Sequence, residues 1–274
     1  MSNNTNHSFS FDTIATIESP YQEKFAIPRQ PNLVSAAKGK VILIGDANNA
    51  ELIRGIEEFS HLWLLFVFHG TKDQGWKPLV RPPRLGGNVK TGVLATRSTF
   101  RPNPIGMSVV KLDRVTTDNK QTILHISGLD LLNGTPIVDI KPYIPYSDAI
   151  IHANGGFAQA KPESNITVNF NIQAQADLAK HATLHTKNQQ AECDLALLIE
   201  QVLKQDPRPA YKQGKVDDKV YAMSLYNLNI QWQFTSLTNI VVLSVTIIPS
   251  EMTGSDLENK IPSNKPLNSK ANIT

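Results

Sequence analysis

The chain has little cysteine and no long apolar run. Its 274 residues include one cysteine, Cys193, which excludes an internal disulfide and any metal site built from several cysteines. The longest apolar run, residues 62–68, has the length of a strand and falls far short of the roughly 18 residues that indicate a membrane span. Residues 1–12 are polar and show no pattern of a secretion signal. We therefore expect a cytoplasmic protein.

Several common catalytic motifs are also missing. The glycines include no G-x-G spacing, which argues against a dinucleotide-binding fingerprint and a Walker loop, and no G-x-S-x-G elbow of an α/β-hydrolase is found. His181 and His185 can share one helical face, but the glutamate that accompanies such a pair in zinc proteases is absent. We expect a solvated helix surface there and no metal.

Positive charge is unevenly placed along the chain. The formal net charge is only +3, yet seven cations lie between residues 72 and 101 against one anion, Asp73. A phosphate backbone responds to a local patch of charge more than to the total, so this segment indicates a nucleic-acid or nucleotide partner. The cations are Lys72, Lys77, Arg81, Arg84, Lys90, Arg97 and Arg101.

The first half of the chain reads as short strands. One helix is expected, capped by Asn49 and carrying Leu52, Ile53, Ile56 and Phe59 on one face. Many short strands with a single helix indicate a barrel or a tightly curled sheet. The expected strands are residues 11–17, 40–44, 61–68, 92–96, 107–115, 122–127 and 137–140, with 107–115 paired to 122–127 across a turn at 117–120.

A second, smaller unit follows a stretch rich in Ala, Asn, Gly and Pro at residues 148–164, which we interpret as a linker. Alternating apolar residues predict strands at 166–172, 226–234 and 240–248, and a helix at 195–203 is expected to end before Pro207. This order is typical of an α+β domain. Residues 250–274 are polar and proline-containing, and we expect a disordered tail.

The strongest functional signal lies in the loops of residues 80–106. Prolines stiffen these loops, and glycines allow a ligand to approach the backbone. Phe100 and Trp76 can stack on an unpaired base. The alternative is a rigid structural loop whose arginines are simply solvated. The arginines that offer planar donors for phosphate are Arg81, Arg84, Arg97 and Arg101.

Two further stretches carry polar residues of interest. Asn133 and Gly134 predict a tight turn, flanked by Asp130 and Asp139, and a hairpin with solvated carboxylates explains them equally well. At residues 206–211, Arg208 and Tyr211 can contact RNA, although a simple helix stop is an equal alternative. The residues alone indicate a nucleic-acid or nucleotide enzyme without specifying its reaction.

Several long motifs, taken in order, resemble one family. They are I-E-S-P-Y at 17–21, F-A-I-P-R-Q-P at 25–31, G-I-E-E-F-S-H-L-W at 55–63, both arginine loops, L-D-L-L-N-G-T-P-I-V-D-I-K-P-Y at 129–143 and Q-D-P-R-P-A-Y at 205–211. The chain is similar over about residues 11–248 to S-adenosylmethionine-dependent tRNA methyltransferases that methylate N6 of threonylcarbamoyladenosine at position 37.

The resemblance implies a fold that is mainly β plus α+β. Residues 11–151 would form a β-barrel that binds S-adenosylmethionine, residues 152–249 a smaller C-terminal α+β domain, and the protein would be a homodimer that binds the tRNA anticodon loop without a metal. The positions implied at the methyl donor are Pro31, Asn32, Leu33, His69, Gly70, Arg97, Met107, Ser127, Gly128, Leu129 and Asp130. Those left for RNA are Arg81, Arg84, Arg101, Phe100, Arg208 and Tyr211.

The implied reaction needs a base and an anion partner. N6 of the modified adenosine must lose a proton, and Asp130 is a candidate base, unless it binds the amino group of the donor instead. The threonyl carboxylate calls for an arginine, for which Arg101 or Arg84 is suitable. Two other functions remain open at this point: a non-catalytic RNA-binding barrel, and an enzyme acting on free nucleotides.

Overall fold

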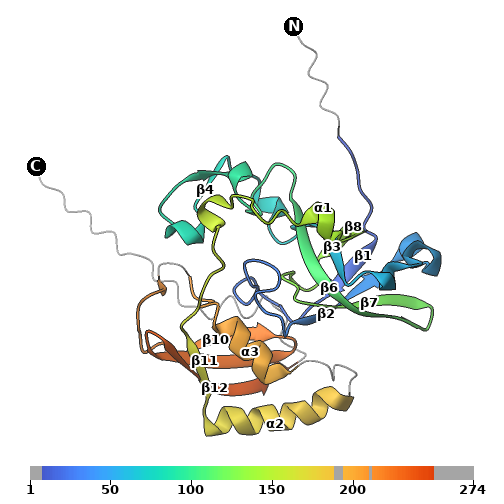
Figure 1. Ribbon diagram of the computed structural model, residues 1–274. Coiled ribbons are helices and arrows are strands. Elements are labelled where there is room, and N and C mark those ends of the chain that lie inside the picture. Colours follow the sequence, from blue (N-terminus) through green and yellow to red (C-terminus); the bar gives the residue numbers. More distant parts are fainter. Residues whose placement is uncertain (1–7, 188–193, 210–211, 250–274) are drawn as a thin grey trace, which may run out of the picture.

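Six strands close into an antiparallel barrel in the order β1-β2-β7-β6-β3-β8. The computed structural model describes residues 8–187, 194–209 and 212–249, and Figure 1 shows the barrel at the upper right. Buried and partly exposed side chains alternate along β3, so one face of this strand fills the barrel core. The predicted N-terminal barrel is confirmed. Its strands are β1 (Ala15–Glu18), β2 (Lys38–Leu43), β3 (His61–Val67), β6 (Ile105–Asp118), β7 (Gln121–Ser127) and β8 (Pro136–Pro142).

The hairpin of β6 and β7 forms where the sequence predicts it. Its two-residue turn places Asn119 at φ 48° and Lys120 at φ 66°, the left-handed backbone that matches the twist of such hairpins. The strand β6 is longer than expected and continues to Asp118, because its outer half pairs with β7 up to the turn.

The helix expected from Asn49 to Phe59 is wrong. The structure has short 3-10 helices instead, η2 (Ala50–Ile53) and η3 (Ile56–Glu58), preceded by η1 (Gly45–Ala47). Asn49 does cap η2, since its side chain accepts a hydrogen bond from the Glu51 amide at 2.9 Å. Gly55 then adopts φ 84°, a left-handed conformation that interrupts the helical path and separates the two turns.

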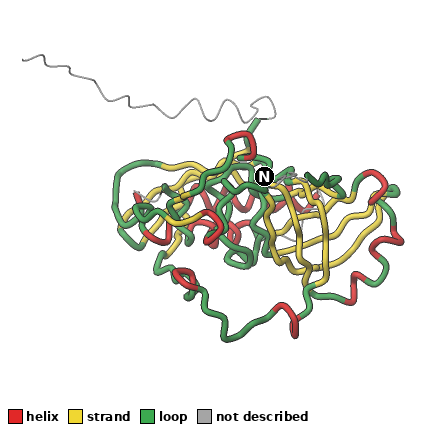
Figure 2. Tube along the Cα trace, turned by 90° about the horizontal axis from the view of Figure 1, so that it is seen from above, coloured by secondary structure: helices red, strands yellow, loops and turns green. Residues whose placement is uncertain are grey.

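The basic segment is a long excursion from the barrel, as predicted. Two short strands, β4 (Leu79–Val80) and β5 (Thr91–Gly92), pair with each other at its base. The strand expected at residues 92–96 is wrong beyond Gly92, where the 3-10 helix η6 (Val93–Ala95) begins. The helical turns η4 (Lys72–Gln74) and η5 (Pro83–Leu85) complete the segment. Figure 2, seen from above, shows that long loops and short helical turns make up much of the chain between the strands.

The C-terminal unit is a four-stranded sheet with two helices, which confirms the predicted α+β class. The strand order is β10-β11-β12-β9, with β9 parallel to β12. The strand β10 and the first part of α2 are not among the elements predicted from the sequence. The elements are β9 (Thr167–Phe170), α2 (Ile172–Lys187), α3 (Leu195–Leu203), β10 (Tyr221–Leu225), β11 (Leu228–Ser236) and β12 (Asn239–Ile247), after α1 (Pro145–Asp148) and η7 (Gly156–Ala158) in the connection from the barrel.

The helix α2 corrects the interpretation of the histidine pair. His181 is buried, and its Nε2 lies 2.9 Å from the carbonyl oxygen of Val245 on β12, so it is a core residue rather than part of a solvated surface. The side chain of His185 and the expected tail at 250–274 lie outside the described residues. No helix among the described residues is long and apolar enough to cross a membrane.

A loop of the barrel, residues 19–37, lies between the two domains (Figure 1, dark blue). Tyr21 forms a β-bridge with Leu225, and the Tyr226 amide donates to the Pro20 carbonyl at 2.7 Å. Further along, the Ala36 amide donates to Gln201 Oε1 at 2.9 Å. The C-terminal domain therefore contacts this loop through hydrogen bonds to the loop's backbone.

Candidate functional site

The segment after β7 is clamped to the interdomain loop. Gly128 has φ 74°, its amide donates to the Ala37 carbonyl at 3.0 Å, and its carbonyl accepts from the Asn32 amide at 2.8 Å. Asn32 itself lies at φ 61°. A Cβ on residue 128 would collide with Asn32 Oδ1 unless that side chain moved, and the left-handed backbone favours glycine here. The structure thus brings the predicted segments 31–33 and 127–130 together.

Replacing Gly128 with alanine should lower the free energy of unfolding by about 1–3 kcal/mol, because the left-handed backbone strains a side chain and Asn32 must move. Urea unfolding monitored by circular dichroism measures this change. Gly134→Ala is the matched control, since Gly134 has φ 76° but open space around its Cβ position. An equal loss in both variants would show that the Asn32 contact is unimportant.

Asp130 is the most perturbed carboxyl group of this region. Its Oδ1 accepts a hydrogen bond from the hydroxyl of Ser108 at 2.5 Å, and Ser108 is a fully buried residue of β6. Burial raises the pKa of Asp130 to about 6, although the Ser108 hydrogen bond, the residue's own backbone and the charge of Arg97 oppose the shift. A carboxyl with this pKa is ionised at neutral pH and remains a usable proton acceptor.

Arg97 approaches the same place from the basic segment. Its Nη1 donates to Gln30 Oε1 at 2.6 Å, which ties the basic segment to the loop that carries Pro31 to Leu33. Its positive charge also opposes the rise in the pKa of Asp130. The hydrogen bond to Gln30 therefore brings one cation to the loop that is clamped to the segment of Asp130.

The other predicted donor positions lie at the same end of the barrel. β3 ends and β6 begins there, since Met107 pairs with Leu65 in the antiparallel ladder. Met107 is half exposed, and His69 and Gly70 follow β3 after Phe68. The Cβ position of Gly70 lies 3.7 Å from Leu132 Cδ2, beside the segment of Asp130. Gly70 and Met107 therefore lie beside the segment that carries Asp130.

The residues predicted to bind RNA differ in their exposure and in their contacts. Arg81 and Arg84 are exposed, and Arg84 Nη2 donates to the Ala160 carbonyl of the linker. Phe100 is half-buried, with the ammonium of Lys77 placed 4.8 Å from its ring centroid. Arg101 folds back on its own loop, where its Nη1 donates to the carbonyl oxygens of Thr96 and Ser98 at 3.1 and 3.3 Å, and Trp76 is 58% exposed.

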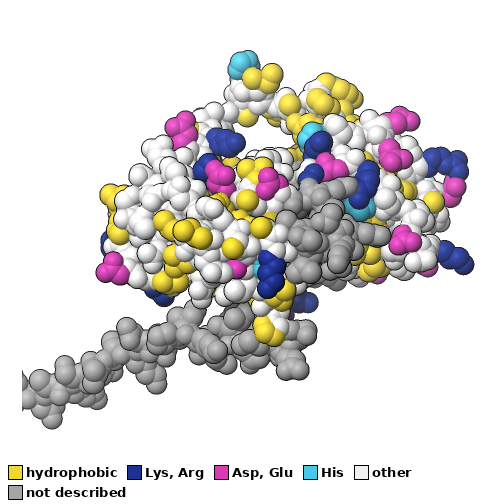
Figure 3. Space-filling view, turned by 90° about the horizontal axis from the view of Figure 1, so that it is seen from below, with side chains coloured by type: hydrophobic (Ala, Val, Ile, Leu, Met, Phe, Trp, Pro, Cys, Tyr) yellow, Lys and Arg dark blue, Asp and Glu magenta, His cyan; other side chains and the backbone are white. Residues whose placement is uncertain are grey.

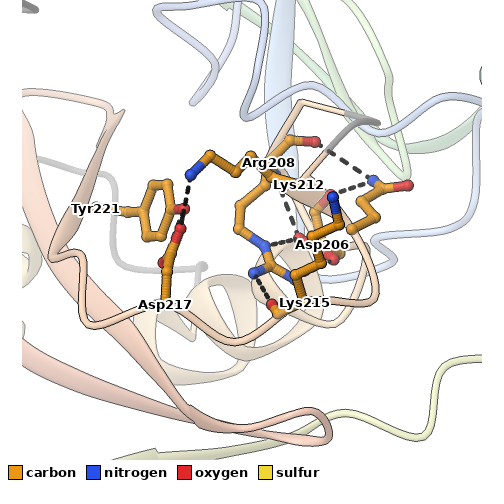
Figure 4. Close-up of polar contacts among 7 residues, drawn as sticks. Asp206, Arg208, Lys212, Lys215, Asp217 and Tyr221 are labelled. Atoms are coloured by element: carbon orange, nitrogen blue, oxygen red, sulfur yellow. Dashed lines mark hydrogen bonds and ion pairs between the residues drawn. The ribbon is translucent and has the colours of Figure 1, made fainter.

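Arg208 is a buried structural residue, which its sequence does not predict (Figure 4). It is 4% exposed, its Nε and Nη2 each donate to Asp206 at 2.8 Å, and its guanidinium lies 3.7 Å from the ring centroid of Phe234. Burial alone would lower the pKa of Arg208, but Asp206 outweighs it and the pKa is raised. The predicted RNA contact is therefore corrected for Arg208, whereas Tyr211 lies outside the described residues.

Two members of the site were missed from the sequence, Ser108 and Gln30. A signal exists for Ser108, because it occupies an inward position of β6 in register with the buried Gly106, Val110 and Leu112. A hydroxyl at such a position requires a partner. Gln30 has no comparable signal in its sequence surroundings.

Arg97 and Met107 fit a ligand with a carboxylate and an apolar chain, such as the methionine part of S-adenosylmethionine. The guanidinium of Arg97 suits a carboxylate, and Met107 offers apolar contact at the barrel end. In addition, the hydroxyl of Thr71, next to Gly70, is buried without a partner among the described residues. Those residues also contain no group of three or more His, Cys, Asp or Glu that could hold a metal ion. A metal-free reaction stays a prediction.

Fold and site together define a class, namely two-domain proteins with a charged site at one end of a closed β-barrel. Residues 16–149 match the family model of the tRNA-methyltransferase O N-terminal domain, and residues 163–247 match that of the TrmO C-terminal domain. The chain therefore belongs to the tRNA-methyltransferase O family.

Individual relatives agree with this assignment. The chain is 50% identical over 228 residues to the tRNA (adenine(37)-N6)-methyltransferase of Escherichia coli, covering 83% of this chain and 94% of that protein. It is 44% identical to a putative S-adenosylmethionine-dependent methyltransferase of Pseudomonas aeruginosa, over 86% and 97% of the two chains. A crystal structure of TrmO from P. aeruginosa superposes with a TM-score of 0.72 at 39% identity, covering 88% of this chain and 99% of that one.

Proposed function

We propose that this protein transfers the methyl group of S-adenosylmethionine to N6 of threonylcarbamoyladenosine at position 37 of tRNA. Methylation of N6 of adenine 37 in tRNA follows from the family and from the E. coli relative. The threonylcarbamoyl group on the adenosine is the finer part of the proposal. One observation carries the proposal as a whole. The Ser108–Asp130 and Arg97–Gln30 hydrogen bonds lie on either side of the clamped Asn32–Gly128 contact in the sequence segments that meet there.

S-adenosylmethionine, when bound, supplies a methyl group attached to a positively charged sulfur. The residues of the chain then have two tasks, alignment and proton removal. We assign proton removal to Asp130: its Oδ1 holds the Ser108 hydroxyl, which leaves the second carboxylate oxygen to accept the proton from N6. We assign the donor's carboxylate to Arg97, whose orientation is fixed by Gln30. The buried surroundings of Asp130 keep competing water away.

The RNA surface is proposed on the basic segment. Among the described side chains on the face seen in Figure 3, Lys and Arg are interspersed with Asp and Glu, which gives no patch of one sign there. The exposed Arg81 and Arg84 and the exposed ring of Trp76 offer phosphate contacts and a stacking surface. Phe100 and Arg101 shape the loop that carries these contacts.

The proposal also includes a cytoplasmic homodimer. The connection after the barrel exposes large apolar side chains, with Tyr146 at 91% and Ile151 at 89% exposure. Clustered exposed apolar residues are typical of surfaces that bind another protein, and a second copy of this chain is the partner that we propose.

Two measurements test the proposed function. S-adenosylmethionine at roughly 100 times its Kd should raise the Tm of the purified protein by about 5 °C or more, because ligand binding adds about 2.7 kcal/mol to the folded state. Nucleoside mass spectrometry should then detect a methyl group on threonylcarbamoyladenosine after incubation with tRNA. Absence of thermal stabilisation would favour a non-catalytic RNA-binding module, and methylation of free nucleotides alone would favour the other alternative.

A further inference from the structure

Asp113 on β6 is a largely buried carboxylate with three side-chain partners. The hydroxyl of Ser127 donates to its Oδ1 at 3.1 Å, and the ammonium of Lys38 donates to its Oδ2 at 2.8 Å. The ammonium of Lys111 lies 3.5 Å from Oδ1, and the Asp113 side chain is only 14% exposed. Burial alone would raise the pKa of Asp113, but the three partners outweigh it and the pKa is lowered. Asp113 is therefore an ionised group that joins β2, β6 and β7.

A β-bulge aims this carboxylate. The ladder of β6 and β7 shifts register between Leu112 and Arg114, which leaves Asp113 as an extra residue of β6 with no residue opposite it. The alternation of inward side chains shifts as well, since Leu112 is buried and the next side chain of β6 packed against the core is Val115. A bulge bends its strand and redirects a side chain. Here the redirected side chain reaches the end of β7, where Ser127 lies.

Both strand ends that Asp113 joins lead directly into the clamp. Ser127 is the last residue of β7 and precedes Gly128. Lys38 is the first residue of β2 and follows Ala37, whose carbonyl accepts from the Gly128 amide at 3.0 Å. Ser127 and Lys38 also lie opposite each other in the ladder of β2 and β7. Asp113 thus ties together the two segments between which this hydrogen bond of the clamp forms.

The side chain of Ser127 serves the position of its own segment. Ser127 is 6% exposed, and its hydroxyl hydrogen is donated to Asp113. The other end of residues 127–130 is held in the same manner, because Ser108 donates its hydroxyl to Asp130 and also belongs to β6. One strand therefore holds both ends of the segment, by Ser108 at the proposed proton acceptor and by Asp113 at the first of the implied donor positions.

An ordinary ion pair of the barrel wall offers a comparison. Glu18 of β1 pairs with Lys40 of β2 at 2.9 Å, two residues beyond Lys38. The Glu18 side chain is 42% exposed, and the pair does not include residues 127–130. Exposed pairs of this kind contribute little. Glu18 is therefore a matched control for Asp113.

We propose that Asp113 is a positioning residue for S-adenosylmethionine: through Ser127 it sets the clamp at Gly128, and with it the main chain on which the donor is proposed to bind. This inference rests on the proposed function and adds a residue outside the implied donor positions. Since Asp130 is held separately, loss of the Asp113 carboxylate should weaken donor binding and leave the proposed proton acceptor in place.

The test compares Asp113→Asn with Glu18→Gln, because both changes replace a paired carboxylate with an amide of nearly the same shape. The Kd for S-adenosylmethionine is measured by calorimetry, without RNA. The neutral amide loses both ammonium partners and weakens the hydrogen bond from Ser127, so Asp113→Asn should raise this Kd roughly tenfold. Glu18→Gln should change it by less than about twofold.

The rate of methyl transfer separates a positioning role from general loss of structure. At saturating donor the single-turnover rate of Asp113→Asn on tRNA should stay within about threefold of the wild type. The rising limb of its pH profile should remain near pH 6, because Asp130 is unchanged. A donor Kd equal to that of the wild type would identify a structural ion pair only and overturn the proposal. So would a lower rate at saturating donor with an unchanged Kd.

Ser127→Ala tests the route by which Asp113 acts. This change removes a single hydrogen bond, so it also provides a folded variant if Asp113→Asn fails to fold. It should raise the donor Kd severalfold, roughly as expected for one hydrogen bond to a charged group. The double variant should bind the donor little worse than Asp113→Asn alone, because contacts in one network are not additive. Fully additive losses would show that Asp113 does not act through Ser127 and overturn the proposal.

Failure of the proposed function gives a different result. A wild type that binds the donor but transfers no methyl group to tRNA contradicts the assigned reaction, while the donor Kd of Asp113→Asn still decides the role of Asp113. If the wild type methylates tRNA and Asp113→Asn binds the donor equally well, the reaction stands and the positioning role is wrong.

Discussion

Replacing Asp130 with asparagine should lower the rate of methyl transfer at saturating donor by about a hundredfold or more, the usual contribution of a positioned general base. The amide has nearly the same shape, so Ser108 keeps a partner. Single-turnover kinetics on modified tRNA measures the rate. If the rate is kept while donor affinity collapses, Asp130 binds the amino group of the donor and is not the base.

The pH dependence of the wild type gives an independent check. Because the base form of Asp130 is required and its pKa is raised to about 6, the rate should rise with pH and level off above about 6. Ser108→Ala removes a hydrogen bond that lowers this pKa, so the rising limb should move to higher pH. If the rising limb of the rate profile stays at the same pH in Ser108→Ala, a group other than Asp130 titrates there.

Ionisation of Asp130 favours the reaction but lowers the stability of the folded protein. Its pKa is raised above the unfolded value of 3.8, so its contribution to stability is present below that value and is lost as the pH rises through about 6. Asp130→Asn should therefore be no less stable than the wild type at neutral pH. This separates loss of catalysis from loss of folding.

Replacing Arg208 with alanine should lower the free energy of unfolding by about 3–5 kcal/mol, because it leaves the Asp206 carboxylate without its partner and removes the cation that packs on Phe234. Urea unfolding measures the loss. Arg54→Ala, which breaks an exposed ion pair with Glu51, should change the free energy of unfolding by less than about 1 kcal/mol. A small effect in both variants would show that the Arg208 contacts do not stabilise the domain.

Much of the fold could be predicted because its signals are local. The continuous apolar run at residues 62–68 identifies β3. The helical spacing of Leu195, Leu198 and Ile199 identifies α3, which Asp194 caps through the Leu197 amide. The same reasoning fails at residues 49–59, where the spacing is helical but Gly55 takes a left-handed conformation.

The site was less accessible to sequence reasoning, because its contacts join distant segments. No residue near Arg208 in the sequence indicates that its guanidinium packs on Phe234. A buried cation was therefore predicted to lie on the surface. Only the hydrogen bond from Arg97 shows that Gln30 belongs to the candidate site. The motifs that resemble the family imply donor positions, but they do not indicate the hydrogen bonds made there, such as that of Ser108 to Asp130.

The interdomain loop has a thermodynamic consequence. Its backbone is hydrogen-bonded to Tyr226 and Gln201 of the C-terminal domain and, through Asn32, to the barrel segment of Asp130. Local opening of the C-terminal domain would therefore release the loop and reduce donor affinity. By linkage, a donor that binds at the barrel end should slow amide hydrogen exchange in β10 and α3, in a domain that contributes no predicted donor contact.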